Sequence, residues 1–294
     1  MNTRYIIVGY DGSSDARAAA DWALDEAGRT GAAVHFVHAV EWPTLMPAAS
    51  MVPATSVWPD AEAEQARTAM LDDVVASAAR THPRVAATKV MVRGSAVGTL
   101  VDLSTRASLL VVGSRGHHPI AGLLLGSVSV AVSAHAHCPV VVVRDGPRES
   151  DRSRLPVLVG VDESACAELA LGFAAEQAAS RDVELHVIRA WRPPADPWEG
   201  PAVDVGEVTG AERTTLHDVV ARWKEKFPAV DVTTHVVVDH PSRALRAASR
   251  AAQLVVVGSR GRGEFRGLML GSVSQYLLHH AECSVAVVRE IPAP

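Results

Sequence analysis

A segment that occurs twice in the chain is the sequence feature that most constrains its fold. The segment GSRGHHPIAGLLLGSVS spans residues 113–129, and GSRGRGEFRGLMLGSVS spans residues 258–274, with 11 of 17 positions identical. Each copy follows a short apolar run, LLVV at 109–112 or LVVV at 254–257, and so indicates a strand, a glycine-rich loop and the start of a helix. At 294 residues the chain is long enough for two domains with separate cores. The repeat therefore predicts two similar domains.

The spacing of the glycines in this segment indicates an anion-binding loop. Each copy has a glycine, two residues, a second glycine, and a Gly-Ser pair after nine more residues. Glycines remove the obstruction of a Cβ atom, and the free N–H groups of the following helix point at whatever is bound. We expect a pair of phosphate-binding loops. No lysine follows either Gly-Ser pair, so fast phosphoryl transfer is not expected, while slow ATP hydrolysis stays open.

Composition narrows the class of protein. The net charge of −5 and the 4% of aromatic residues argue against nucleic-acid binding through a basic face or stacked bases. No run approaches the roughly 20 apolar residues that span a membrane, and the N-terminus lacks the pattern of a signal peptide. The three cysteines fit reduced thiols. We expect a cytoplasmic protein without a membrane segment.

Strand-like and helix-like segments alternate along both halves. Alternation of this kind implies parallel strands joined by right-handed crossovers, so each half is predicted to be an α/β domain with a doubly wound, parallel, five-stranded sheet and helices on both faces. The expected domains are 1–145 and 155–294, joined by a polar linker at 146–154. The expected strands are 4–9, 34–40, 84–92, 108–112 and 139–143, then 155–162, 185–188, 230–238, 254–257 and 284–289; the helices include 60–80, 94–106, 127–135, 209–227 and 241–252, and Gly28 and Gly31 are expected to end the first helix.

Ligands of doubly wound sheets bind beyond the carboxyl ends of the strands. Asp11 and Gly113 both follow predicted strands, so they are expected to meet there although they are far apart in the sequence. Asp162 is the counterpart of Asp11 in the second half.

These residues resemble the universal stress protein family in its tandem-domain form. The resemblance rests on VG-x-DGS at 8–13 and on the glycine loop that ends in Gly-Ser, and it covers nearly the whole chain. It implies the strand order 3-2-1-4-5 in each half and the binding of ATP, with Mg²⁺ left open.

The resemblance also implies which residues would contact nucleotide. Ser127 and Ser272 stand at predicted helix starts, where a hydroxyl, backbone N–H groups and the helix dipole converge on a phosphate. The residues around the phosphates of the first nucleotide would be Gly113, Ser114, Arg115, Gly116, Gly126 and Ser127, and those of the second Gly258, Ser259, Arg260, Gly261, Arg262, Gly263, Gly271, Ser272 and Val273; Gly9, Asp11, Gly160 and Asp162 would line the adenosine side, and Ala39 and Ala190 would offer backbone groups to adenine.

Each of these roles has a structural alternative. The Gly-Ser pairs would serve equally as a turn with a serine N-cap, the arginines as solvated surface charges, and the two aspartates as turn residues that bond to the local backbone. The first loop carries His117-His118-Pro119 where the second carries Arg262-Gly263-Glu264. The first site is therefore expected to be the weaker one.

Two segments rich in histidine, at 135–138 and 279–283, each include a cysteine. They fit either a metal site or polar side chains that satisfy the carbonyl groups at a helix end. We expect the second role and no metal site.

The preferred hypothesis is a nucleotide-binding regulatory protein whose occupancy changes the surface offered to an unknown protein partner. Two alternatives remain: a slow metal-dependent ATPase that uses Asp11 and Asp162, and an interaction protein independent of nucleotide. The apolar strands 140–143 and 285–288 would be a liability if left as open edges. The resemblance implies that they pair the two halves, and a homodimer stays open.

Overall fold

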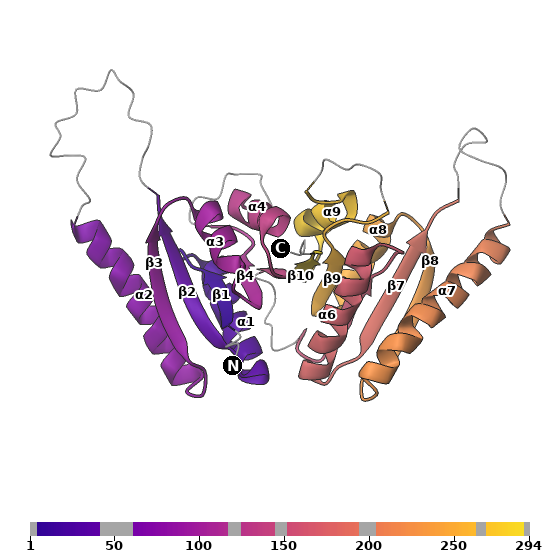
Figure 1. The fold of residues 1–294 in the computed structure, drawn as a ribbon, viewed down its shortest axis with the longest axis horizontal. Helices are drawn as coiled ribbons and strands as arrows, with labels where there is room; N and C mark the ends of the chain where they lie inside the picture. The colour runs from indigo at the N-terminus through magenta and orange to yellow at the C-terminus, as the bar shows by residue number, and fades with distance from the viewer. Residues whose placement is uncertain are drawn as a thin grey trace, which may run out of the picture.

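The computed structural model describes residues 5–41, 61–116, 125–144, 152–193, 204–262 and 269–290. They form a single sheet with helices on both faces (Figure 1), in the strand order β3-β2-β1-β4-β5-β10-β9-β6-β7-β8. Read from the outer edge of the sheet toward its middle, each half has the expected order 3-2-1-4-5. The elements of the first half are β1 (Tyr5–Gly9), α1 (Ser14–Thr30), β2 (Ala33–Val40), α2 (Ala61–Thr81), β3 (Ala87–Arg93), α3 (Ala96–Ser104), β4 (Leu109–Gly113), α4 (Ser127–His135) and β5 (Val140–Val143).

The second half repeats this succession. Its elements are β6 (Val157–Gly160), α6 (Ala165–Arg181), β7 (Leu185–Trp191), α7 (Val205–Lys226), β8 (Val232–Val238), α8 (Pro241–Ala248), the 3-10 turn η2 (Ser249–Ala251), β9 (Leu254–Gly258), α9 (Ser272–His280) and β10 (Ser284–Val288). None of the helices in the described ranges is long and apolar enough to cross a membrane.

Several predicted boundaries differ from those of the structure, and local capping explains two of them. Helix α1 continues through Gly28 and ends at Gly31, which has a left-handed φ of 71° and donates its N–H to the carbonyl of Ala27. Helix α7 begins earlier than predicted because the carboxylate of Asp204 accepts the N–H groups of Gly206 and Glu207. Strand β6 is shorter than the predicted 155–162. Residues 42–59 of the predicted long loop and 146–151 of the predicted linker lie outside the described ranges.

The sheet is buried on both faces. Ile6 and Val8 of β1 point into one apolar core with α1, α2, α6 and α7, whereas Ile7 points into the other with α3, α4, α8 and α9. This continuous burial is typical of parallel strands covered by crossover helices. Both cores contain residues of both halves, because the sheet continues from one half into the other.

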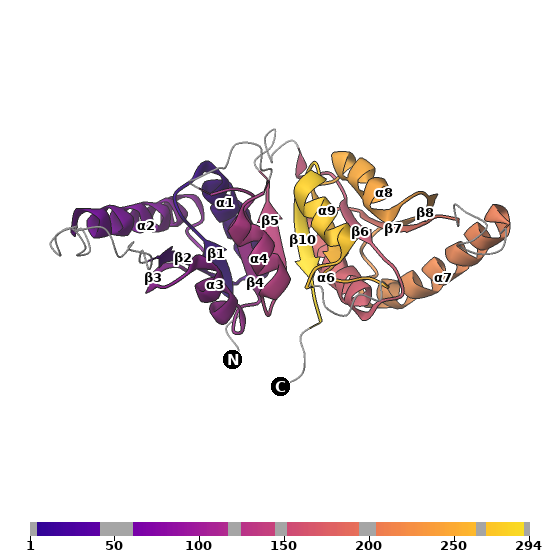
Figure 2. The ribbon, with the colours of Figure 1, turned by 90° about the horizontal axis from the view of Figure 1, so that it is seen from above.

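The two halves meet through antiparallel pairing of β5 and β10, which lie side by side at the middle of the molecule (Figure 2). Val142 pairs with Val285, and Val140 pairs with Val287. This agrees with the expectation that the apolar strands pair the halves, because each strand covers the edge of the other.

Two arginines next to this pairing reach across it. The Arg144 guanidinium, just after β5, donates to the carbonyl of Leu278 in α9. The Arg289 guanidinium, just after β10, donates to the carbonyls of Ala134 and Ala136 at the end of α4. A cation at a helix C-terminus is stabilised by the helix dipole. The helix ends that histidines were expected to satisfy thus receive an arginine from the other half.

Candidate functional site

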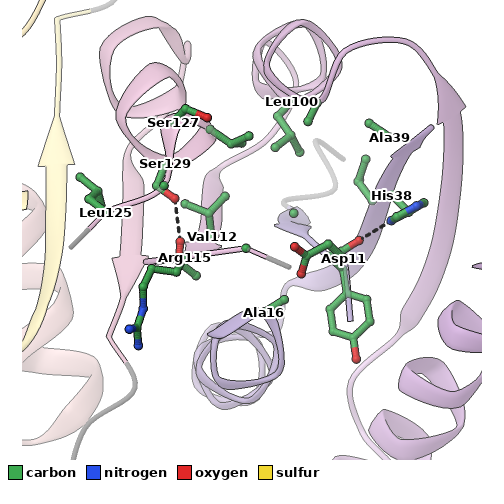
Figure 3. Close-up of a pocket in the computed structure, with 18 residues that line it drawn as sticks. Asp11, Ala16, His38, Ala39, Leu100, Val112, Arg115, Leu125, Ser127 and Ser129 are labelled. Atoms are coloured by element: carbon green, nitrogen blue, oxygen red, sulfur yellow. Dashed lines mark hydrogen bonds between the residues drawn. The ribbon is translucent and has the colours of Figure 1, made fainter. Parts of the chain in front are cut away.

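The first candidate site is a pocket of about 330 Å³ at the carboxyl ends of β1, β2 and β4 (Figure 3). Ser114 points away from it: this side chain is buried and donates to the carboxylate of Asp15 at 2.7 Å. The predicted residues that line the pocket are Gly9, Asp11, Ala39, Gly113, Arg115, Gly116, Gly126 and Ser127.

The second candidate site is the equivalent pocket of the other half, with a volume of about 660 Å³. Ser259 is fully buried and does not line it. Gly263, like His117, His118, Pro119 and Glu264, lies outside the described residues. The predicted residues that line this pocket are Gly160, Asp162, Ala190, Gly258, Arg260, Gly261, Arg262, Gly271, Ser272 and Val273.

The helices that begin at the glycine loops lack a side-chain cap. Gly126 is the N-cap of α4 and Gly271 that of α9, and neither helix has a side-chain hydrogen bond at this end. Ser127 and Ser272 are the first helical residues, so they do not act as the N-caps of the alternative interpretation. The other helices with a described N-cap are capped by the side chains of Ser13, Ser95, Ser164, Asp204 and His240.

An uncapped helix start leaves backbone donors for something else. The first four N–H groups of any helix have no partner within the helix, and together with the dipole they form a site for an anion. Ser127 and Ser272 line the two pockets. Each pocket therefore contains a helix end suited to a phosphate group.

Hydrogen bonds hold each glycine loop against its helix. The N–H of Gly126 donates to the carbonyl of Ser114 at 2.7 Å, and the hydroxyl of Ser129 donates to the carbonyl of Gly113 at 2.7 Å (Figure 3). In the second half, Gly271 N–H and the Ser274 hydroxyl both donate to the carbonyl of Ser259, at 2.7 and 3.1 Å. The glycine N–H bond is thus the same in both halves, while the serine hydroxyl bonds to neighbouring carbonyls of the loop.

The two aspartates combine turn chemistry with a place in the pocket. Asp11 accepts the N–H of Ser13 at 3.0 Å, and Asp162 accepts that of Ser164 at 2.9 Å. The second carboxylate oxygen of Asp162 also accepts the N–H of Arg262 at 3.0 Å. Since both aspartates also line their pockets, the turn role and a ligand role are compatible.

The arginines of the loops differ in their partners. The Arg115 side chain is half-exposed and its Nε lies 3.3 Å from the Asp15 carboxylate. Arg262 pairs with Glu163 at 3.1 Å, and Glu163 also accepts from the buried Arg189 at 2.7 Å. Arg260 is exposed and has no ion pair within the described part of the chain.

Apolar side chains make up much of both pockets, and the sequence analysis did not identify them. Leu100 of α3 and Leu245 of α8 lie over the glycines at the ends of β1 and β6: a Cβ atom on Gly9 would lie 3.1 Å from Leu100, and one on Gly160 would lie 2.6 Å from Leu245. His38 also lines the first pocket, and its ring bonds to the carbonyl of Tyr10 at 2.8 Å (Figure 3). Its place directly before Ala39 in the sequence could have indicated that it belongs to the site.

The cysteines next to the histidine-rich segments are buried thiols. Burial raises the pKa of Cys138 and of Cys283 to about 12. Over the ranges that the structure describes, histidine, cysteine and acidic residues form no group of three or more that could hold a metal ion.

The structure defines a class of doubly wound α/β folds with a glycine-rich loop and a pocket in each half, and comparison with known proteins identifies the family. The sequence model of the universal stress protein family matches residues 2–144 and 154–289. The chain belongs to the universal stress protein family, in a form with two tandem domains.

Relatives of the same length support this assignment. A universal stress protein of Mycobacterium tuberculosis is 37% identical over 292 residues, 97% of each chain, and one of Mycolicibacterium smegmatis is 36% identical over 290 residues, 97% of this chain and 96% of the relative. A crystal structure of a universal stress protein from Archaeoglobus fulgidus shares the fold, with a TM-score of 0.71, 20% identity, and coverage of 99% of this chain and 97% of that one.

Proposed function

We propose that this chain binds ATP in the two pockets and acts as a nucleotide-dependent regulatory protein in the cytoplasm. The observation that carries the proposal is the pair of uncapped helix starts, Ser127 and Ser272, each facing a pocket next to a glycine loop. The apolar residues at the other end of each pocket suit a nucleobase. Occupancy regulates a partner only if ATP binds one conformation of the loops better than another.

The proposed protein binds ATP but catalyses little or no fast reaction. Ser127 and Ser272 directly follow Gly126 and Gly271, where a Walker A loop has the lysine that contacts the β and γ phosphates. Metal-dependent ATP hydrolysis is the alternative function, favoured by the position of Asp11 and Asp162 in the pockets. It predicts turnover that Asp162→Ala abolishes, whereas the binding protein retains ATP with almost no turnover.

Equilibrium dialysis with labelled ATP tests the proposed sites. A Cβ atom on Gly116 would lie 2.9 Å from Asp11 Oδ2, and one on Gly261 would lie 2.6 Å from Asp162 Oδ2. Glutamate at both positions would fill the pockets and place a second carboxylate beside each aspartate. The double variant Gly116→Glu and Gly261→Glu should therefore lose ATP binding.

The matched control is Gly210→Glu, at an exposed position of α7 where an added side chain meets nothing within 4 Å. It should bind ATP like the wild type. Equal binding by the double variant and the control would rule out the proposed sites.

A further inference from the structure

The first glycine loop is held from beneath by a buried carboxylate. Asp15, in the first turn of α1, is only 3% exposed. It accepts hydrogen bonds from the Ser114 hydroxyl at 2.7 Å, the Arg115 N–H at 2.9 Å and the Arg115 Nε at 3.3 Å. All three donors belong to the glycine loop, and two of them belong to Arg115, which lines the pocket, so this carboxylate already occupies donors of a residue that a phosphate would use.

The second loop has a neutral side chain at the same place. Cys166 follows Asp162 by four residues, as Asp15 follows Asp11, and its Sγ lies 3.8 Å from the hydroxyl of Ser259. Among the residues described, no carboxylate pairs with Arg260. Burial lowers the pKa of Arg289, and the positive charge of Arg260 lowers it further. The two arginines are therefore close enough to repel each other.

The nucleoside ends of the two pockets do not differ in this way. Val37, Leu100, Val112 and Leu125 line the first, and Ile188, Leu245, Val257 and Leu270 stand at the matching positions of the second. Tyr10 and His38 line the first pocket only, but neither brings a carboxylate, so a different response to phosphate charge is expected at the phosphate end. There the first loop has a buried negative charge, which solvent screens only weakly, and the first pocket has half the volume of the second.

We propose that Asp15 sets how strongly the first pocket favours phosphate charge: it lowers the affinity of this pocket for ATP relative to adenosine, whereas the neutral Cys166 leaves the affinity of the second pocket for ATP undiminished. This inference rests on the proposed nucleotide binding. Asp15 does not line the pocket, so it acts through Arg115 and through its charge. The second pocket also has Glu290 in its lining, and its Arg262 pairs with Glu163, so the comparison between the pockets concerns the charge directly beneath the loop, at Asp15 and Cys166.

Isothermal titration calorimetry with ATP and with adenosine tests the role of Asp15 in the full chain. The first pocket is measured alone in the Gly261→Glu background. There Asp15→Asn, which removes the charge and keeps the size, should tighten ATP binding about tenfold, the effect of one charge across roughly 10 Å at an effective dielectric constant of about 20. The affinity for adenosine should stay within about twofold.

The reciprocal change is made in the second pocket, in the Gly116→Glu background. Cys166→Asp should weaken ATP binding by a similar factor and leave adenosine unchanged, whereas the neutral control Cys166→Asn should retain the wild-type ratio of the two affinities. Because a gain of ATP affinity does not follow from poor folding, the Asp15→Asn result separates an electrostatic role from a structural one.

Two outcomes would overturn the inference. If ATP and adenosine bind but their affinity ratio does not respond to either exchange, or if Asp15→Asn weakens both ligands equally, Asp15 is only a structural residue and the proposed nucleotide binding stands. If neither ligand binds any variant or the wild type, the inference fails together with the proposed function.

Discussion

The carboxylate of Glu26 in α1 lies 2.9 Å from Nη1 of Arg181 in α6, and both side chains are almost completely buried. The two residues belong to different halves of the chain. Gln177 donates to the other oxygen of Glu26 at 2.8 Å, and the guanidinium of Arg181 lies 5.1 Å from the centre of the Trp22 ring. Together with the pairing of β5 and β10, this cluster fixes one half against the other.

Removal of the Glu26 charge should destabilise the whole protein. In Glu26→Gln the positive charge of Arg181 stays buried without the carboxylate that balances it, which costs roughly 3–5 kcal/mol of unfolding free energy. Urea denaturation measures the change. The control is Glu168→Gln, which removes the exposed pair with Arg222 and should cost less than about 1 kcal/mol. Equal losses in the two variants would mean that the buried pair contributes no more than a surface one.

The tight approach of the first glycine loop to α1 predicts a second result. A Cβ atom on Gly113 would lie 2.6 Å from the backbone carbonyl carbon of Asp15, and backbone atoms yield less readily than a side chain. Gly113→Ala should therefore cost roughly 1–3 kcal/mol and weaken ligand binding in the first pocket. In contrast, Gly28 lies at an exposed position in the last turn of α1 with nothing within 4 Å of an added Cβ, so Gly28→Ala should stabilise by up to about 1 kcal/mol. Thermal unfolding of the two variants checks this; similar melting temperatures would contradict the predicted clash.

The buried thiols predict how stability depends on pH. Burial raises the pKa of Cys138 and Cys283 from an ordinary value of 9.0 to about 12. Between pH 9 and 12 the unfolded chain loses these protons while the folded chain keeps them. The contribution of each thiol is complete below pH 9 and decreases above it by up to about 1.4 kcal/mol per pH unit.

Urea unfolding at pH 8, 9 and 10 measures this dependence. The double variant Cys138→Ala and Cys283→Ala is the comparison, because it retains every other group that titrates in this range. Stability should fall more steeply with pH in the wild type than in the variant. Parallel curves would show that the thiols do not contribute.

The order of the elements was predictable from the sequence, because it follows from local periodicity and from the duplicated segment. The resemblance to a family supplied the strand order. Element ends were predicted less well where one side chain decides them, as Asp204 does for α7. The contacts of Asp15 with Ser114 and Arg115 join residues about 100 positions apart, so no local pattern indicates them. The same holds for Arg144 and Arg289, whose targets lie in the opposite half.

The central claim is that the helix starts at the glycine loops bind the phosphates of ATP. The most direct test is the change in backbone amide chemical shifts when ATP is added to the isotopically labelled chain. The largest changes should occur at Ser272 and Val273, the first turn of α9, and at Arg260, and the Gly261→Glu variant should lose them. Changes confined to the outer strands β3 and β8, or no changes at saturating ATP, would contradict the claim.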